Sequence, residues 1–301
     1  MTQSMLSHQA LGGMQTAMGR VAKAQEQLTT GRIINRPSDD PSGATTAMRI
    51  RSSMAMQDQY VRNGDDAVGW LNQADGTLTS VTDQVRRARE IALQGANDGA
   101  MGQDARDALA TEIDQIRQGL VSSANTTYLD RPIFGGLTAG GRAYDYQVPG
   151  DSSTQVDFIG LSDPNGVVRT IADGAKVRVD VEGPDVFGQP NDTVFDHLTA
   201  LAASLRSGNT AGITSAVDSL AVDGTRVTNV QAEIGARTNR VERAQSVATD
   251  SALSLKSSLS EVENTDLAKA TVDLGLQNVA YQAALGATAR VIQPSLLDFL
   301  R

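Results

Sequence analysis

The longest hydrophobic pattern of the chain lies towards its C-terminal end, between about residues 227 and 262. Apolar residues return there at every seventh position, and a second, more polar seam follows four residues behind the first. The first seam contains Val227, Ile234, Val241, Ala248, Leu255 and Val262, and the second contains Gln231, Thr238, Gln245, Ala252 and Leu259. Alternating spacings of four and three are typical of coiled coils. We therefore expect one long helix that needs partner helices to cover its apolar stripe.

Helical periodicity also covers the N-terminal part of the chain and the residues after the long heptad run. The spacing predicts helices over residues 5–30, from Pro41 to about 95, from about 104 to 126, from about 192 to 206 and from about 267 to 292. The second of them carries an apolar stripe of Leu71, Ala74, Leu78, Val81, Val85, Ala88 and Ala92. The heptad phase breaks at residues 261–266, where Asn264 or Thr265 is expected to cap the last helix.

The middle of the chain has a different composition. Five of the eight prolines lie between residues 132 and 190, and seven of the eleven aromatic residues lie between 128 and 195. Short runs of alternating apolar and polar residues occur there, of which Val177–Val181 is the clearest. Such runs, bounded by glycine and proline, are typical of short strands. Residues 127–200 contain eleven acidic and five basic residues, so this region is also acidic.

These patterns predict a mainly α protein. The N- and C-terminal arms would form a long antiparallel coiled-coil bundle around a small central β-rich domain. We expect three domains. They are a terminal coiled-coil assembly domain (1–41 with 264–301), a helical bundle domain (42–131 with 211–263) and a β-rich outer domain (132–210).

The two terminal helices are the predicted assembly interface. Their seams contain Leu11, Met14, Met18, Val21 and Leu28 near one end of the chain and Leu267, Leu274, Tyr281, Leu285 and Ile292 near the other. Polar residues interrupt both seams, at Gln25, Thr271, Asn278 and Thr288, and the last helix has a second apolar face with Leu276, Val279 and Ala283. Apolar burial contributes only ~25 cal/mol per Å², whereas ordering a residue costs roughly 1–2 kcal/mol. We therefore expect these helices to be largely disordered in a lone molecule and to fold when they join neighbouring subunits.

The sequence offers no pattern for catalysis, a cofactor or a metal. It contains no cysteine, and its two histidines, His8 and His197, do not stand at metal-ligand spacing, so we expect both to be ordinary helix residues. Neither a nucleophile elbow nor a phosphate-binding loop is present. The net charge of -9 disfavours nucleic acid as a partner. No window approaches eighteen consecutive apolar residues, so membrane insertion is not expected.

A proline-flanked acidic motif separates the first two predicted helices. It reads Asn35-Arg36-Pro37-Ser38-Asp39-Asp40-Pro41-Ser42-Gly43-Ala44. Pro41 suits the first position of a helix, and a preceding carboxylate can accept hydrogen bonds from the free amides of the first turn. We therefore interpret Pro37, Ser38, Asp39, Asp40 and Pro41 as a helix-junction motif rather than as paired catalytic acids or metal ligands.

A small basic cluster lies on the second predicted helix, at Arg86, Arg87 and Arg89. Its simplest interpretation is a solvated helix face. Contact with an acidic partner helix is the alternative.

The junction motif and the helical arms resemble the flagellin superfamily. The resemblance covers roughly residues 1–134 and 211–301, and it includes Thr29-Thr30-Gly31-Arg32, Ala124-Asn125-Thr126-Thr127, Phe134-Gly135-Gly136 and the break at Val262–Asp266. Within the superfamily, Pro37, Pro41 and the final residues 295–300 are more similar to hook–filament junction proteins than to filament subunits. The resemblance is weak over residues 137–210.

The resemblance implies an extracellular structural protein of the bacterial flagellum and no enzyme. Such a protein is exported unfolded through the flagellar type III apparatus with a dedicated chaperone, and the N-terminus here lacks the apolar core of a cleaved signal peptide. It forms a ring between the first hook-associated junction protein and the flagellin filament. Two alternatives stay open, a filament subunit (flagellin) and a cytosolic coiled-coil scaffold, which heptads alone would permit.

Overall fold

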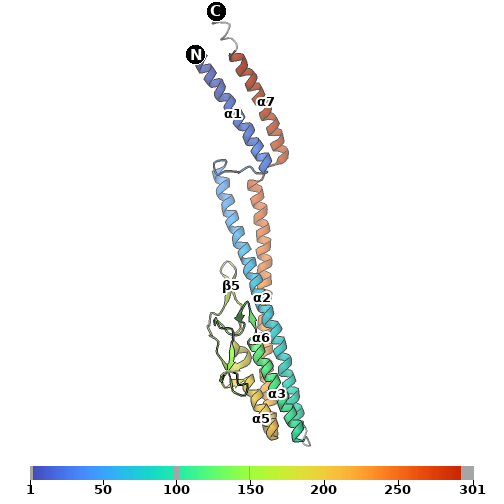
Figure 1. The fold of residues 1–301 in the computed structure, drawn as a ribbon. Coiled ribbons are helices and arrows are strands. Elements are labelled where there is room, and N and C mark those ends of the chain that lie inside the picture. Colours follow the sequence, from blue (N-terminus) through green and yellow to red (C-terminus); the bar gives the residue numbers. More distant parts are fainter. Residues whose placement is uncertain (1–2, 98–101, 149, 293–301) are drawn as a thin grey trace, which may run out of the picture. The chain divides into compact units, whose positions relative to one another are not determined.

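The computed structural model describes residues 3–97, 102–148 and 150–292, and its fold is mainly helical (Figure 1). The chain divides into two compact units, one made of the residues up to Met56 and from Asp250 onward, the other of Gln57–Thr249. Two long helices, α2 (Pro41–Asn97) and α6 (Thr210–Glu263), continue from one unit into the other. The expected fold class, helical arms with a small central β-rich region, is confirmed. The finer division into three domains stays a prediction.

The core of the Gln57–Thr249 unit lies among four helices, which are α2, α6, α3 (Gln103–Ala124) and α5 (Val194–Ser207). Every residue of the apolar stripe predicted for α2 is buried, and so are Val227, Ile234, Val241 and Ala248 of α6. Gln245 of α6 donates a hydrogen bond to the backbone of α2, to the carbonyl of Val61 at 3.2 Å. The heptad pattern therefore located both helices and the sides on which they pack.

Capping sets the boundaries of α5. Thr193 and Asp196 form a reciprocal capping box, in which each side chain accepts a hydrogen bond from the backbone N–H of the other. At the other end Gly208 takes a left-handed conformation with φ of +67°, which a side chain would oppose. The buried positions of α5 are Val194, Phe195, Leu198, Leu201, Ala202 and Leu205.

The β-rich region consists of four two-stranded antiparallel hairpins and one short helix. The pairs are β1 (Thr127–Tyr128) with β2 (Arg131–Pro132), β3 (Tyr144–Tyr146) with β4 (Val156–Phe158), β5 (Val168–Ala172) with β6 (Ala175–Arg178), and β7 (Gly188–Gln189) with β8 (Asp192–Thr193). Helix α4 (Gly183–Phe187) precedes β7. An aromatic cluster joins the hairpins to α5, with ring centroids 5.3–5.4 Å apart among Tyr144, Phe158, Phe187 and Phe195.

The strand expected at Val177–Val181 is shorter than predicted, because β6 ends at Arg178. The carboxylate of Asp180 accepts a hydrogen bond from the backbone N–H of Val167 at 2.7 Å. If the strand ladder continued, that N–H would donate to a backbone carbonyl of the neighbouring strand. A side chain therefore replaces the backbone partner at the point where the strand stops.

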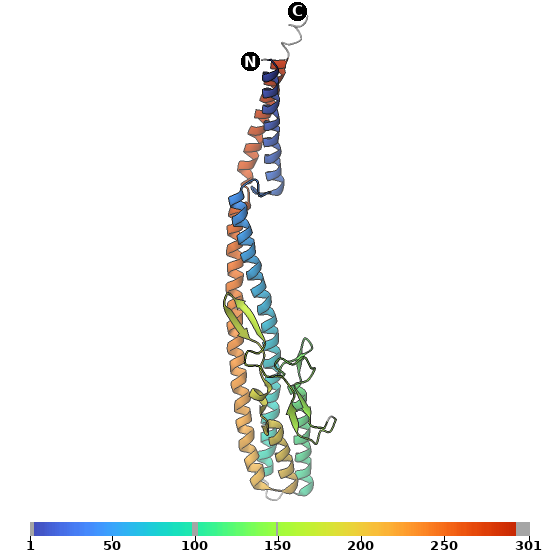
Figure 2. The same cartoon turned by 90° about the vertical axis from the view of Figure 1, so that its left-hand side faces the viewer.

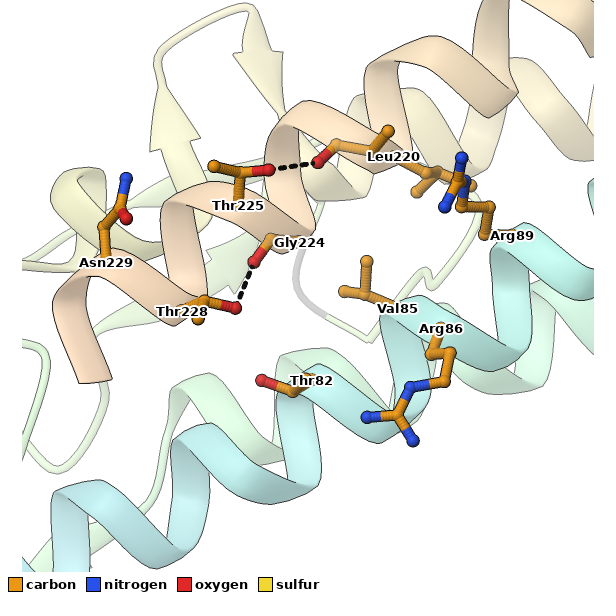
Figure 3. Close-up of a pocket in the computed structure, with 10 residues that line it drawn as sticks. Thr82, Val85, Arg86, Arg89, Leu220, Gly224, Thr225, Thr228 and Asn229 are labelled. Carbon is orange, nitrogen blue, oxygen red and sulfur yellow. Dashed lines mark hydrogen bonds between the residues drawn. The ribbon is translucent and has the colours of Figure 1, made fainter. Parts of the chain in front are cut away.

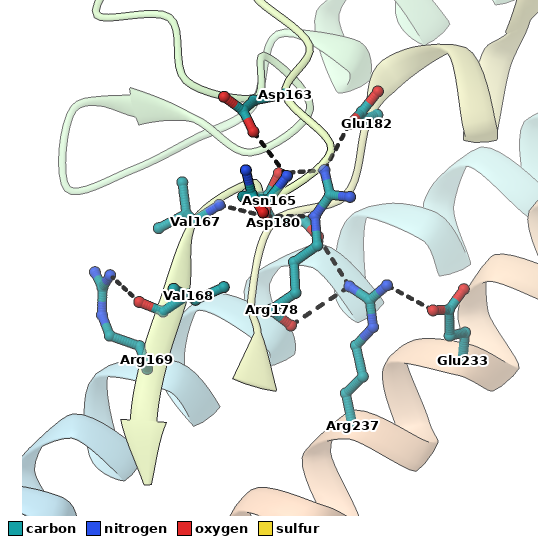
Figure 4. Close-up of polar contacts among 10 residues, drawn as sticks. All are labelled: Asp163, Asn165, Val167, Val168, Arg169, Arg178, Asp180, Glu182, Glu233 and Arg237. Atoms are coloured by element: carbon teal, nitrogen blue, oxygen red, sulfur yellow. Dashed lines mark hydrogen bonds and ion pairs between the residues drawn. The ribbon is translucent and has the colours of Figure 1, made fainter. Parts of the chain in front are cut away.

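A polar network holds the β5–β6 hairpin against α6 (Figure 4). Asp180 is buried and accepts a bond from Arg178 Nε at 2.9 Å. Arg237 of α6 donates to the backbone carbonyl of Asp180 at 2.9 Å and pairs with Glu233 at 2.6 Å. Hydrogen bonds to charged groups are stronger than neutral ones, so this network positions the hairpin on the helix.

His197 bridges α5 and α6 between two carboxylates. Its Nδ1 lies 2.7 Å from Asp223 Oδ2, and its Nε2 lies 3.0 Å from Asp192 Oδ1. Asp223 is fully buried on α6 and also accepts a bond from Arg226 at 2.7 Å. Its hydrogen bond with His197 raises the pKa of the histidine above the ordinary value, despite partial burial. His197 therefore has a structural role that its position in a helical pattern did not indicate.

We predict that the stability contributed by His197 declines as the pH rises. Because its pKa is raised in the folded protein, the folded state keeps a proton that the unfolded chain loses near pH 6.5. The contribution is complete below that pH and is lost as the pH passes the pKa of the folded state. Chemical denaturation of the wild type and His197→Gln should differ by about 1–2 kcal/mol at pH 6 and by less at pH 9. His8→Gln, at an exposed position of α1 (Gln3–Thr30), is the matched control, and a pH-independent difference for His197→Gln would contradict the assignment.

Candidate assembly interface

Helices α1 (Gln3–Thr30) and α7 (Leu267–Ile292) form an antiparallel pair (Figures 1 and 2). The end of α1 meets the start of α7, where the N–H of Thr265 donates to the carbonyl of Gly31 at 2.9 Å. Along the pair, Cα atoms of one helix come within 8 Å of Cα atoms of the other. The two helices are therefore in contact along the pair.

Small residues explain the close approach. The half-buried and buried positions follow heptad spacing, with Ala10, Met14, Ala17, Val21, Ala24 and Leu28 in α1 and Ala270, Leu274, Gln277, Tyr281, Ala284 and Thr288 in α7. Alanine occupies every second position of the α1 seam, so the backbones can approach with few atoms between them. Among the described side chains of these two helices, only Ala24 and Ala270 are fully buried. The pair therefore buries little apolar surface by itself.

The structure places the predicted interface residues on two different faces. Those in the seam are Met14, Val21, Leu28, Leu274 and Tyr281, whereas Leu11, Met18, Leu267 and Leu285 are exposed. The side chain of Ile292 lies outside the described residues. In α1 every second position of the seam is shifted by one residue from the prediction, so that Ala10, Ala17 and Ala24 take the places of Leu11, Met18 and Gln25.

The exposed face of the pair is also apolar. Val272, Leu276 and Val279 of α7 are 71%, 63% and 63% exposed, and Met5, Leu11 and Met18 of α1 are exposed as well. Soluble monomers rarely present a continuous apolar stripe of this kind to water, and such a stripe marks a surface that other molecules cover. The second apolar face of α7, which the sequence predicted, thus has no partner among the residues that the structure describes.

Backbone pairing fixes the segment between α1 and α2 to the turn before α7. Ile33 donates its N–H to the carbonyl of Glu263 at 2.7 Å, and Arg32 forms an antiparallel bridge with Asn264. Gly31, with φ of +70°, ends α1 and provides the sharp change of direction. Asp266 caps α7 by accepting bonds from the N–H groups of Ala268 and Lys269, so the predicted cap at Asn264 or Thr265 was wrong. Asn264 and Thr265 are instead engaged with the linker.

The two aspartates of the junction motif have separate structural roles. Asp40 Oδ1 accepts bonds from Ser42 and Gly43 N–H at 3.0 Å each, which is the predicted N-cap of α2. Asp39 Oδ2 accepts bonds from the N–H groups of Asn35 and Arg36, and Asp39 Oδ1 pairs with Lys23 at 3.1 Å. The bond from Arg36, followed by that from Lys23, holds the pKa of Asp39 below its usual value. Pro37 and Ser38 form the exposed turn between Arg36 and Asp39.

A buried carboxylate lies at the centre of this junction. The side chain of Glu263 is only 6% exposed, its Oε1 lies 2.7 Å from Arg51 Nη2, and its Oε2 lies 4.0 Å from Arg32 Nη1. The same residue supplies the carbonyl that accepts the bond from Ile33. Glu263 therefore ties α2, α6 and the linker together, and sequence reasoning missed it because its partners are distant along the chain.

Across residues 3–97, 102–148 and 150–292, no group of three or more potential metal-ligating side chains gathers in one place. Over the same ranges, every helix is too short or too polar to cross a bilayer.

Comparison with known families identifies both helical arms. The model of the bacterial flagellin N-terminal helical region matches residues 2–136, and that of the C-terminal helical region matches residues 215–300. Flagellar hook-associated protein 3 of Escherichia coli is 26% identical over 93% of this chain and 93% of its own length. A flagellin of Halalkalibacterium halodurans is 25% identical over 93% of this chain and 91% of its own.

The fold also matches a solved structure. A putative flagellar hook-associated protein from Vibrio parahaemolyticus superposes with a TM-score of 0.68 at 22% identity, over 75% of this chain and 100% of that one. The match therefore includes the whole of that solved chain.

We predict that Glu263→Gln loosens the junction. The substitution keeps the size of the side chain but removes the charge that accepts from Arg51, which should cost about 1–3 kcal/mol in the free energy of unfolding. The N–H of Ile33 donates to Glu263 and the N–H of Thr265 donates to Gly31, and amide exchange at both should also become faster. Glu261→Gln, at an exposed position of the same helix, is the control. Equal behaviour of the two variants would show that the buried carboxylate does not hold the junction.

Proposed function

The chain belongs to the flagellin family, and on that premise we propose that it is a structural subunit at the junction between the flagellar hook and filament. Its role is mechanical, because it links the hook-side junction protein to the flagellin filament. The observation that carries the proposal is the α1–α7 pair, whose outer apolar face has no partner within the described chain.

Similarity over nearly the full chain supports the junction role within the family. The curated relative from Escherichia coli that bears the name hook-associated protein 3 matches along both arms and through the middle. The flagellin comparison reaches similar identity, so a filament subunit is the second candidate. The prolines of the junction motif, Pro37 and Pro41, favour the junction branch.

Burial explains why the ends of the chain would serve as the assembly surface. The seam between α1 and α7 covers only one side of each helix, and α7 keeps Val272, Leu276 and Val279 exposed. Covering those side chains with neighbouring helices would contribute ~25 cal/mol per Å² of apolar surface. The terminal helices thus acquire most of their stability from neighbouring subunits.

The proposed partners follow from this arrangement. They are further copies of the chain in a ring, the first hook-associated junction protein on one side and flagellin on the other. An export chaperone would cover the apolar stripe before assembly. We place the protein outside the cell, in the flagellum, and propose export through the flagellar apparatus.

We predict that α1 and α7 are largely unfolded in a lone molecule. Amide exchange on dilute protein should show little protection over residues 14–28 and 274–288, because Ala24 is the only buried residue that the structure describes in these two stretches. The buried helices of the Gln57–Thr249 unit provide the internal reference, and their amides should exchange slowly. Strong protection of both terminal stretches in the monomer would contradict this prediction.

Deletion of the gene is expected to leave hooks without filaments and to release flagellin into the medium. The wild-type gene should restore filaments, whereas a Leu276→Asp, Val279→Asp variant should not, because two carboxylates would enter an apolar interface. Val247→Asp, at a 65% exposed position of α6 in the other unit, is the matched control and should restore filaments.

Normal filaments in the deletion strain would overturn the junction role. The filament-subunit alternative predicts a different result, in which the protein is abundant and distributed along the filament. Labelling the protein in intact flagella separates the two, since a junction subunit gives one spot at the base of each filament.

A further inference from the structure

A groove lies between α2 and α6 in the Gln57–Thr249 unit (Figure 3). It encloses about 410 Å³, and the residues along it include Val85 of α2 and Leu220 of α6. Thr225 and Thr228 of α6 donate their hydroxyls to their own helix, at 2.9 and 2.8 Å, so neither needs a partner in the groove. The groove therefore presents small side chains such as Thr225 and Thr228 above a buried floor that includes Val85 and Leu220.

Two arginines one helical turn apart form the α2 rim of the groove. Arg86 pairs only with Asp83 of its own helix, at 3.3 Å between two well-exposed side chains. Arg89 forms no hydrogen bond or ion pair within the described ranges of the chain. Arg87, between them in sequence, points to the opposite flank of α2, where it pairs with Glu112 of α3 at 2.7 Å. Apart from the exposed contact of Arg86 with Asp83, neither rim arginine pairs with a carboxylate in the described part of the chain.

The rim stands out because the unit around it is acidic. Residues 57–249 contain 26 acidic and 16 basic side chains. A second copy of the same unit therefore carries an excess of carboxylates that a basic rim would attract.

The exposed face of α3 has the matching chemistry. Asp104 and Asp107 are exposed and one helical turn apart, and neither forms an ion pair within residues 3–97, 102–148 and 150–292. Ala108 and Thr111 continue the same exposed face, so a neighbouring helix could approach closely. Since α3 packs on the flank of α2 opposite the groove, one copy presents the groove on one side and the acidic helix on the other.

We propose that the groove between α2 and α6 receives the N-terminal half of α3 from a second copy of the chain. Arg86 and Arg89 of one copy pair with Asp104 and Asp107 of the next, while small residues of α3 cover the groove. The two surfaces are different, so the contact is head-to-tail and generates a ring or a helical array rather than a closed dimer. The inference rests on the proposed function, because it names the lateral contact of the junction ring.

Single-cysteine variants test the contact, and the cysteine-free chain provides a clean background. Thr225→Cys places a thiol in the groove, and Ala108→Cys places one on the exposed face of α3. The two variants are mixed and treated with a short bis-maleimide, both as concentrated purified protein and in flagella of a deletion strain expressing both. We expect a covalent dimer in the mixture and none with either variant alone.

In the control mixture, Val247→Cys takes the place of Thr225→Cys. Val247 is exposed on α6 but lies outside the groove. This pair should give about tenfold less dimer than the groove pair, because the bis-maleimide joins only thiols that lie within the length of its short spacer. Reaction of every variant with a monofunctional maleimide confirms that each thiol is accessible. Three results would each overturn the inference. They are equal amounts of dimer in both mixtures, a dimer of Ala108→Cys with itself, and accessible thiols that give no dimer.

Charge reversal supplies an independent readout. Cross-linking should fall about tenfold when Arg86 and Arg89 are both changed to Glu in the Thr225→Cys variant, since like charges then meet. It should recover when the Ala108→Cys partner carries Asp104→Arg and Asp107→Arg. If the charge exchange does not restore cross-linking while the variants still restore filaments, the contact is rejected and the junction role stands. A deletion strain with normal filaments would reject the junction role, whatever the purified protein shows.

Discussion

A pair of helices can cover only one side of each member, and this constraint governs the terminal part of the molecule. The seam of α1 and α7 is built largely from alanine, and only Ala24 and Ala270 are fully buried there among the described side chains. Small residues allow close approach but contribute little apolar area. The outer faces keep large apolar side chains exposed, Leu276 and Val279 among them. Under the proposed function, helices of neighbouring subunits would cover these faces.

The Gln57–Thr249 unit covers the apolar faces of its helices with elements of the same chain. Helices α3 and α5 add two more apolar faces to α2 and α6, and the aromatic cluster around Tyr144 fills the space between hairpins and α5. Charged side chains of α6 then hold the outer elements in place. Arg237 donates to the backbone of the β5–β6 hairpin, and Asp223 pairs with His197 of α5. Four helices and an aromatic cluster supply the burial that two thin helices lack, so this unit can be ordered before assembly.

Sequence periodicity predicted the helices well, because a stripe repeated over many turns is a long signal. The buried faces of α2 and α6 followed directly from their heptads. The choice between Leu11 and Ala10 as seam positions did not follow, since spacing alone cannot show that the smaller residue faces the partner. Contacts such as Glu263 with Arg51 were also out of reach, because their partners are separated by more than two hundred residues. The end of β6 was missed because a side chain of Asp180 replaces the ladder.

The position of Glu263 connects these two kinds of stability. Its carboxylate and its backbone carbonyl hold Arg51 and Ile33, so the linker is anchored to α2 and α6 rather than to the seam of α1 and α7. Breaking a buried charge contact costs more than losing a few half-exposed apolar contacts. The terminal helices can consequently separate and fold again while the junction that aims them stays in place. In the proposed junction subunit, this order would direct the last helices before they are formed.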